Sequence, residues 1–248
     1  MLYIKKYSGF IISIVIGLLL YEEANYAYTY RAATAYSDHM IYRLILSMGS
    51  GSSGWNGILF PILAVLPMGI SYVREYRSGY LKLRLQKMSR KRYVAVTLIQ
   101  NAILGGLGLL IPYAVYCLHL YFEYGTKAYL NIKEGETVIM FYPKLAASNT
   151  IAYVCLLGAF VLLAGVKFAT FAIGISAWIK NTFLTLILPF VLCIAMAILI
   201  PDNRFDLLLI FAPNGYAWAS VPIILIMSGV LILTGIILFA VGVKNNEK

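Results

Sequence analysis

The chain has 248 residues, of which 61% are hydrophobic and 12% are charged, and its net charge at pH 7 is +10. Soluble domains are about 45–50% apolar and about 25% charged, so a water-soluble fold of this length would expose far too much apolar surface. The composition therefore excludes an ordinary soluble domain and predicts a protein in contact with the lipid bilayer. Because the positive charge lies in short loops between apolar runs, it argues against nucleic-acid binding and fits membrane orientation and anionic lipid contact.

The first two apolar runs are each long enough to cross a bilayer. Residues 3–21 form the first predicted span, since a crossing helix needs about 20 residues. The polar segment 22–53 follows. Its tyrosines are typical of a membrane boundary, although a substrate-facing surface stays open as an alternative. The segment ends in the glycine- and serine-rich run 49–54, which predicts a hinge. Residues 55–73 form the second predicted span, where Pro61 and Pro67 predict kinks.

A strongly basic segment, residues 74–92, follows the second span. It holds eight of the twenty Lys and Arg residues and a single acid, Glu75. Positive residues near the ends of spans stay on the cytoplasmic side of a membrane. The segment is therefore predicted to be cytoplasmic, and it orients every other segment.

Four further spans are predicted at residues 93–122, 149–178, 182–200 and 221–243. In the third span, Gly105, Gly106 and Gly108 permit another helix to approach closely. The fourth span contains Lys167, an intramembrane charge that is a candidate for the transport pathway or for a water-filled vestibule. Between the last two spans, the apolar piece 207–212 is too short to cross and is predicted to be interfacial or re-entrant. Tyr216 and Trp218, just after it, are further pathway candidates.

These segments predict an all-α, polytopic membrane protein with a single domain, residues 1–248, and six spans. Six spans place both termini on one side. With both termini inside, the inner segments carry thirteen of the twenty positive residues, whereas acids outnumber positive residues in the outer segments. That distribution is what the positive-inside rule demands. The three cysteines lie within apolar runs and the two histidines are isolated, so no metal site is predicted.

The stretch SYVREYRSGYLKLRLQKMSRKRYVAV, residues 71–96, resembles the permease subunits of ABC-2 type transporters. The residues that carry the resemblance are Glu75, Ser78, Gly79, Leu81, Leu83, Leu85, Ser89 and Arg90. The six spans and the short outer element, here residues 206–220, also resemble that family. The sequence departs from it before the first span, where only MLYIKK stands in place of an amphipathic helix.

The resemblance implies a bacterial exporter subunit in the plasma membrane that is not itself an enzyme. Two permease chains, identical or different, would form the pathway, and separate cytoplasmic ATPase subunits would bind ATP and Mg²⁺. In keeping with this, the chain has no G-x-x-x-x-G-K-[ST] loop and needs no cofactor of its own. The expected substrate is amphipathic or hydrophobic, such as a peptide toxin or an antimicrobial.

The resemblance also implies that residues 74–90 form the coupling segment, a helix that contacts the ATPase. The residues predicted to couple are Glu75, Ser78, Gly79, Tyr80, Leu81, Leu83, Arg84 and Leu85. The alternation of leucines with polar residues fits a strand template, and we follow the resemblance in expecting a helix. Two other functions stay open: a carrier or channel that works without an ATPase, and a membrane immunity or scaffold protein.

Overall fold

The computed structural model describes residues 2–31, 39–45, 47–48, 55–126, 142–200, 207 and 221–246. Most of these residues are helical and none lies in a strand, which confirms the all-α prediction. Five of the described helices are long and apolar enough to cross a membrane. They are α1 (Leu2–Arg31), α6 (Arg90–Tyr124), α8 (Thr150–Ile179), α9 (Thr182–Leu199) and α10 (Val221–Asn245). The shorter helices are α2 (Met40–Ile45), α3 (Trp55–Val65), α4 (Ser71–Arg77), α5 (Tyr80–Lys87) and α7 (Pro143–Ser148).

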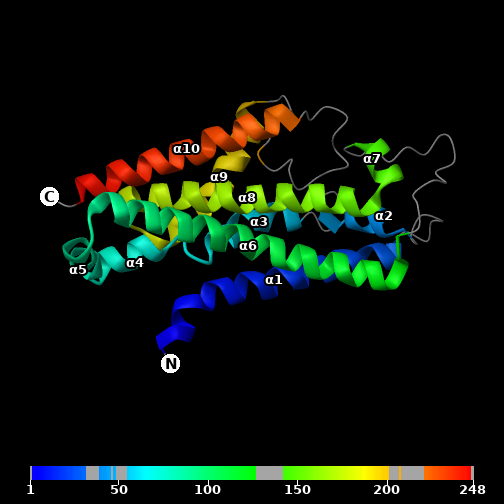
Figure 1. The fold of residues 1–248 in the computed structure, drawn as a ribbon, viewed down its shortest axis with the longest axis horizontal. Coiled ribbons are helices and arrows are strands. Elements are labelled where there is room, and N and C mark those ends of the chain that lie inside the picture. Colours follow the sequence, from blue (N-terminus) through cyan, green and yellow to red (C-terminus); the bar gives the residue numbers. More distant parts are fainter. Residues whose placement is uncertain are drawn as a thin grey trace.

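Helix α8 lies at the centre of the bundle, with α6 along one side and α10 along another (Figure 1). Glycines make these close approaches possible. A Cβ placed on Gly105 would contact the side chain of Ala169 and the backbone of Gly165 on α8. One placed on Gly174 would lie 2.5 Å from the carbonyl oxygen of Gly235 on α10. The prediction that glycines of the third span permit close helix packing is therefore confirmed.

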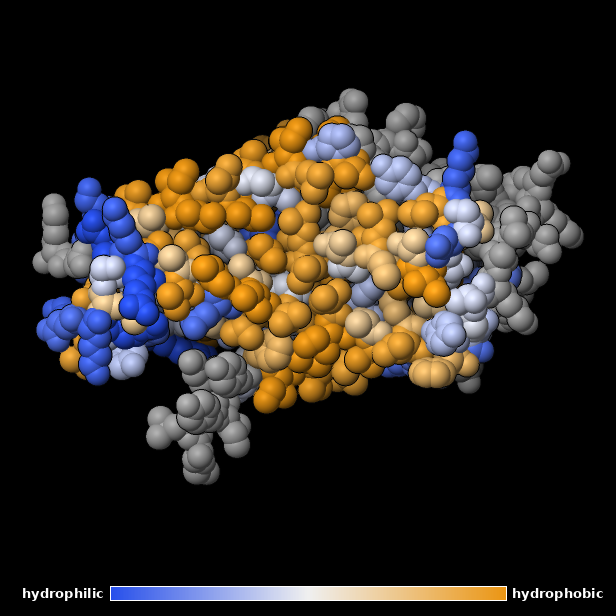
Figure 2. Space-filling model, in the orientation of Figure 1, coloured by the Kyte–Doolittle hydropathy of each residue, from blue (hydrophilic) through white to orange (hydrophobic). Residues whose placement is uncertain are grey.

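The surface of the bundle divides into an apolar belt between two polar ends (Figure 2). The end at the left of Figures 1 and 2 carries α4, α5 and the C-terminus of α10, and we call it the basic end. The belt covers the middle of the long helices, where exposed isoleucines, leucines and valines face outward. This arrangement gives the chain transmembrane character, because water would not tolerate so broad an apolar surface.

The second predicted span, residues 55–73, is divided between α3 and α4. Helix α3 ends at Val65, and the turn that follows contains Pro67. Proline has no N–H, so the carbonyl four residues earlier, that of Leu63, loses its helical donor. The hydroxyl of Ser13 on α1 donates to that carbonyl over 2.9 Å instead. The predicted break therefore lies at Pro67, whereas α3 continues through Pro61, and a sixth crossing stays a prediction.

Several boundaries differ from those predicted. Helix α1 continues to Arg31, ten residues beyond the predicted end of the first span at residue 21, so the expected polar segment begins as helix. The predicted hinge, 49–54, lies outside the described residues. So does the outer element, 206–220, apart from Leu207. The orientation with both termini inside also stays a prediction.

Candidate functional site

The predicted coupling segment forms a sharp corner at the basic end, which we call the α4–α5 corner (residues 71–87). Helix α4 ends as the Ser78 N–H donates to the carbonyl of Arg74 over 3.0 Å. Gly79 then adopts a left-handed conformation with φ of 72°, which costs other residues energy. Helix α5 starts at Tyr80, and the helix expected from the resemblance is present in place of a strand. Ser89 caps α6, with its side chain accepting from the N–H of Arg92.

An ion pair with an added hydrogen bond holds the corner closed. The Arg84 guanidinium on α5 lies 2.6 Å from Glu75 Oε1 on α4. The hydroxyl of Tyr93, on α6, donates to the other carboxylate oxygen over 2.9 Å. Arg84 also stacks over the ring of Tyr93, with its Cζ 4.9 Å from the ring centroid. Since Glu75 and Arg84 are mostly shielded from solvent, the pair fixes the angle between α4 and α5 more firmly than an exposed pair would.

Helix α5 presents different leucines to the protein and to solvent. Leu81 is only 4% exposed and belongs to a core with Tyr72, Tyr93 and Phe239, against which Leu85 also packs. Leu83 is 54% exposed and Tyr80 is 53% exposed. In a strand, the three alternating leucines would share one face, whereas the helix separates Leu83 from the other two. The corner therefore offers an outward surface with an apolar centre among basic side chains.

The turn between α8 and α9 supports α4, and sequence reasoning missed this support. Arg77 donates to the carbonyl of Lys180 over 2.9 Å, and the Lys180 ammonium donates to the Tyr76 hydroxyl over 3.0 Å. Asn246, after α10, donates to the Tyr72 hydroxyl over 3.0 Å. These residues lie more than a hundred positions from their partners. No local sequence pattern pairs residues at such separations.

A cavity of about 570 Å³ adjoins the corner at the basic end. Its charged lining residues are Arg74, Glu75, Arg84 and Lys87, and Ser71, Tyr80 and Gln100 add uncharged polar groups. The structure thus brings three predicted coupling residues, Glu75, Tyr80 and Arg84, to the wall of a cavity that the sequence did not indicate.

Lys167, the predicted intramembrane charge, lies inside the protein. Its side chain is 1% exposed, and its ammonium donates to the carbonyl of Leu207 over 2.9 Å. The ammonium also lies 4.7 Å from the centroid of the Phe168 ring. A buried ammonium needs such partners, because isolated charge in an apolar medium is costly. The contact ties the middle of α8 to the chain after α9. Tyr216 and Trp218, the other pathway candidates, lie outside the described residues.

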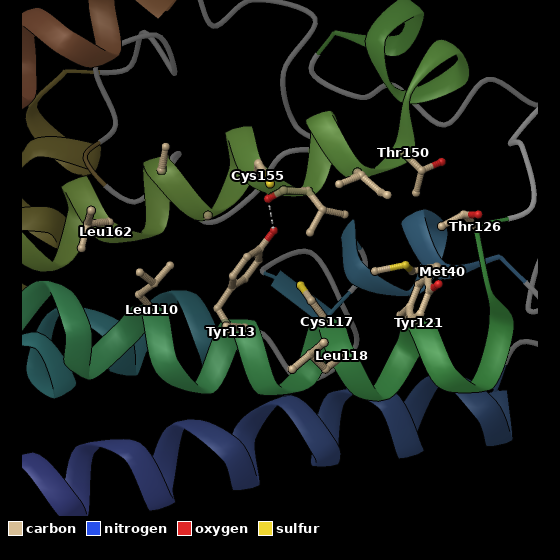
Figure 3. Close-up of a pocket in the computed structure, with 15 residues that line it drawn as sticks. Met40, Leu110, Tyr113, Cys117, Leu118, Tyr121, Thr126, Thr150, Cys155 and Leu162 are labelled. Atoms are coloured by element: carbon tan, nitrogen blue, oxygen red, sulfur yellow. Dashed lines mark hydrogen bonds between the residues drawn. The ribbon is translucent and has the colours of Figure 1, made fainter.

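An apolar crevice of about 620 Å³ opens between α6 and α8, toward the end of the bundle opposite the basic end (Figure 3). Leu110, Cys117 and Leu118 line it from α6, and Cys155 and Leu162 line it from α8. Tyr113 crosses part of it and donates to the carbonyl of Val154 over 2.7 Å, so its hydroxyl is satisfied. The crevice is suited to an apolar ligand group. Nothing in the sequence indicated it, because the residues that line it follow the ordinary pattern of an apolar helix face.

Comparison of the chain with family models, with curated proteins and with solved structures finds no match.

Proposed function

We propose that this chain is the permease subunit of an ATP-driven exporter of the ABC-2 type. In this proposal the helices cross the bacterial plasma membrane six times with both termini in the cytoplasm, and the basic end is cytoplasmic. Two such chains form the translocation pathway, and separate ATPase subunits bind ATP and Mg²⁺. The chain itself carries out no catalysis.

One observation carries the proposal. Helix α5 is a short helix at the end of an apolar bundle; its inner face is held by contacts with the protein, and its solvent-exposed face carries apolar side chains. Glu75, Arg84 and Tyr93 fix its angle, and Leu81 anchors its inner face. A helix that transmits movement from a partner to the spans must be rigid relative to them, and these contacts supply that rigidity. Leu83 and Tyr80 face outward, and an apolar side chain within a polar rim is typical of protein interfaces.

The interior supports an amphipathic or hydrophobic substrate. The crevice between α6 and α8 is lined almost entirely by apolar groups and opens on the apolar belt. A substrate arriving from the bilayer would therefore keep its apolar part out of water while it enters. Lys167 is a buried cation on α8, one of the two helices that form the crevice. In this proposal its ammonium contacts the polar part of the substrate once its hydrogen bond to the Leu207 carbonyl opens.

Co-purification tests the proposal in the native host. We would tag the chain, solubilise the membranes in mild detergent and identify retained proteins that carry a P-loop. The wild-type chain should retain an ABC-type ATPase. Leu83→Asp should reduce that ATPase by about tenfold or more, because central interface residues are worth about 2 kcal/mol or more.

Leu83→Met is the matched control, since it keeps an apolar side chain and should retain the ATPase at the wild-type level. Membrane insertion of all three chains is checked by their yield in the membrane fraction. A wild-type chain that retains no P-loop ATPase would reject the proposal and leave a carrier, a channel, or an immunity or scaffold protein. Equal retention by Leu83→Asp would show that α5 is not the docking element.

A further inference from the structure

The cavity beside the α4–α5 corner has the chemistry of a binding site, and it shares Tyr80, but not Leu83, with the outward face of α5. Its volume of about 570 Å³ falls in the range of about 300–1,000 Å³ that is common for small-ligand sites. Three cations line it, Arg74, Arg84 and Lys87, together with one carboxylate, that of Glu75. The lining therefore has a net charge of +2, which favours an anionic ligand.

Two of the charged side chains in the cavity are not paired with one another or with Glu75. Glu75 already accepts from Arg84 and from Tyr93. In the part of the chain that the structure describes, Arg74 and Lys87 take part in no ion pair and no side-chain hydrogen bond. Both are exposed at the rim, where an ammonium and a guanidinium can donate to the oxygens of an incoming anion.

A buried hydroxyl in the wall points to the same ligand class. The Oγ of Ser71, at the start of α4, is buried and has no hydrogen-bond partner among the described residues. Buried polar groups in proteins are nearly always hydrogen-bonded, so an orphaned hydroxyl that lines a cavity calls for a partner from outside the chain. An anionic oxygen would accept from Ser71 while it also accepts from Arg74.

Apart from Tyr80 and Gln100, the remaining lining is apolar, and it identifies the source of the anion. Pro67, Met68, Ile70 and Met88 form that part of the wall. The cavity lies beside α4 and α5 at the basic end, and the apolar belt adjoins that end (Figure 2). A soluble anion would gain nothing from an apolar wall, whereas a phospholipid has its phosphate and its acyl chains on either side of such a boundary.

We propose that this cavity binds an anionic membrane phospholipid, with the phosphate headgroup among Arg74, Lys87 and Ser71 and the glycerol and first methylenes against Ile70 and Met88. The bound lipid would link α4 to α5 and attach the corner to the bilayer surface. This inference does not rest on the proposed transport function, because the lipid would bind Arg74, Lys87 and Ser71, whereas the ATPase contact is tested at Leu83, which does not line the cavity.

A lipid titration tests it on the purified full-length chain in detergent. The probe is phosphatidylglycerol with a fluorophore on its acyl chain. Unlabelled phosphatidylglycerol should displace the probe, whereas phosphatidylcholine and millimolar inorganic phosphate should not. Arg74→Gln together with Lys87→Gln should weaken binding by about tenfold or more, because the pair removes two charge-assisted hydrogen bonds to the phosphate.

The matched control removes two positive charges from the same end but outside the cavity: Lys91→Gln together with Arg92→Gln. This double variant should change the affinity by less than about twofold, since it removes only non-specific electrostatic attraction between the protein surface and the lipid. Arg74→Lys together with Lys87→Arg keeps the charge and should keep most of the affinity. Equal weakening by the two glutamine pairs would overturn the proposal and indicate diffuse attraction to lipid.

Full displacement of the probe by inorganic phosphate would also overturn it, since the site would then recognise the phosphate alone. A second measurement on the unaltered chain covers the case of a misfolded variant. Phosphatidylglycerol with a photoreactive headgroup should cross-link to peptides that contain residues 67–74 or 84–88. Cross-linking confined to other peptides would reject the site.

Discussion

The Ser13 hydroxyl on α1 donates to the carbonyl oxygen of Leu63 on α3, over 2.9 Å. That carbonyl is the one left without a helical donor by Pro67. The same hydroxyl lies 3.4 Å from the carbonyl oxygen of Gly108, which Pro112 on α6 leaves free in the same way. One buried serine hydroxyl thus lies within hydrogen-bond distance of two carbonyls, on different helices, that prolines leave without a helical donor. This hydrogen bonding by Ser13 stabilises the bundle, because a backbone carbonyl without a donor costs free energy in an apolar medium.

Replacement of this serine should destabilise the bundle. Ser13→Ala leaves both carbonyls without the donor, and we expect it to lower the free energy of unfolding in detergent by about 1–3 kcal/mol. Ser228→Ala on α10 is the matched control, since Ser228 is also buried but its hydroxyl has no partner among the described residues. The control should unfold at the wild-type denaturant concentration or slightly above it. Equal losses in the two variants would contradict the role given to Ser13.

The left-handed residue at the α4–α5 corner should resist substitution for a backbone reason alone. A Cβ at Gly79 would meet nothing within 4 Å, so space is not limiting, yet its φ is 72°. Gly79→Ala should therefore cost about 1–2 kcal/mol, the penalty of the left-handed conformation for a residue with a Cβ. Gly79→Asn should cost less, because asparagine adopts this conformation more readily.

The control for this position is Gly229→Ala on α10, where a Cβ would also meet nothing and φ is not left-handed. This change should leave stability unchanged or raise it by about 0.5–1 kcal/mol, since alanine is the better helix former. Thermal unfolding of the four purified chains compares the effects directly. A loss at Gly229 as large as that at Gly79 would show that the backbone conformation is not the cause.

The ion pair of the corner should contribute measurably to stability. Glu75→Gln keeps the shape of the side chain but leaves Arg84, which is mostly shielded from solvent, without its counter-ion. We expect a loss of about 1–3 kcal/mol, as for other hydrogen bonds to charged groups. Glu23→Gln, an exposed acid on α1, should change stability by no more than about 0.5 kcal/mol. A double-mutant cycle with Arg84→Gln should recover the pair's coupling, and additive losses would rule that coupling out.

The burial of Lys167 predicts protection from water-soluble reagents. In a chain that carries Cys155→Ala, which removes the exposed native thiol, Lys167→Cys should not react with an aqueous maleimide while the protein is folded. It should react after denaturation. Lys82→Cys on the exposed side of α5 should react in the folded state, which makes it the control. Equal labelling rates at the two positions would place residue 167 in contact with water and contradict the buried contact with Leu207.

Much of the helical architecture was predictable from the sequence. The predicted spans at 93–122, 149–178, 182–200 and 221–243 differ by only a few residues from α6, α8, α9 and α10. The reason is local: in a bilayer every backbone group must be satisfied within its own segment, so a long apolar run has little choice but a helix. The break in the second span was predictable for a similar reason. Pro67 lacks a backbone N–H whatever the tertiary structure, so it always removes one helical hydrogen bond.

The contacts that give the candidate sites their chemistry were decided only by the tertiary structure. Glu75 meets Arg84 and Tyr93, nine and eighteen positions away, because α4, α5 and α6 fold back on one another at Gly79 and Met88. The sequence by itself determined that Lys167 would be an unusual charge within a span, but not that it would donate to Leu207, forty residues later. Alternating leucines predicted a strand as readily as a helix, and only packing against Tyr72 and Phe239 separates Leu81 from Leu83. The hydrophobic periodicity of a sequence predicts one helix or strand at a time. A cavity or an ion pair depends instead on where several helices end relative to one another, and those positions are set by the burial of apolar surface between distant segments.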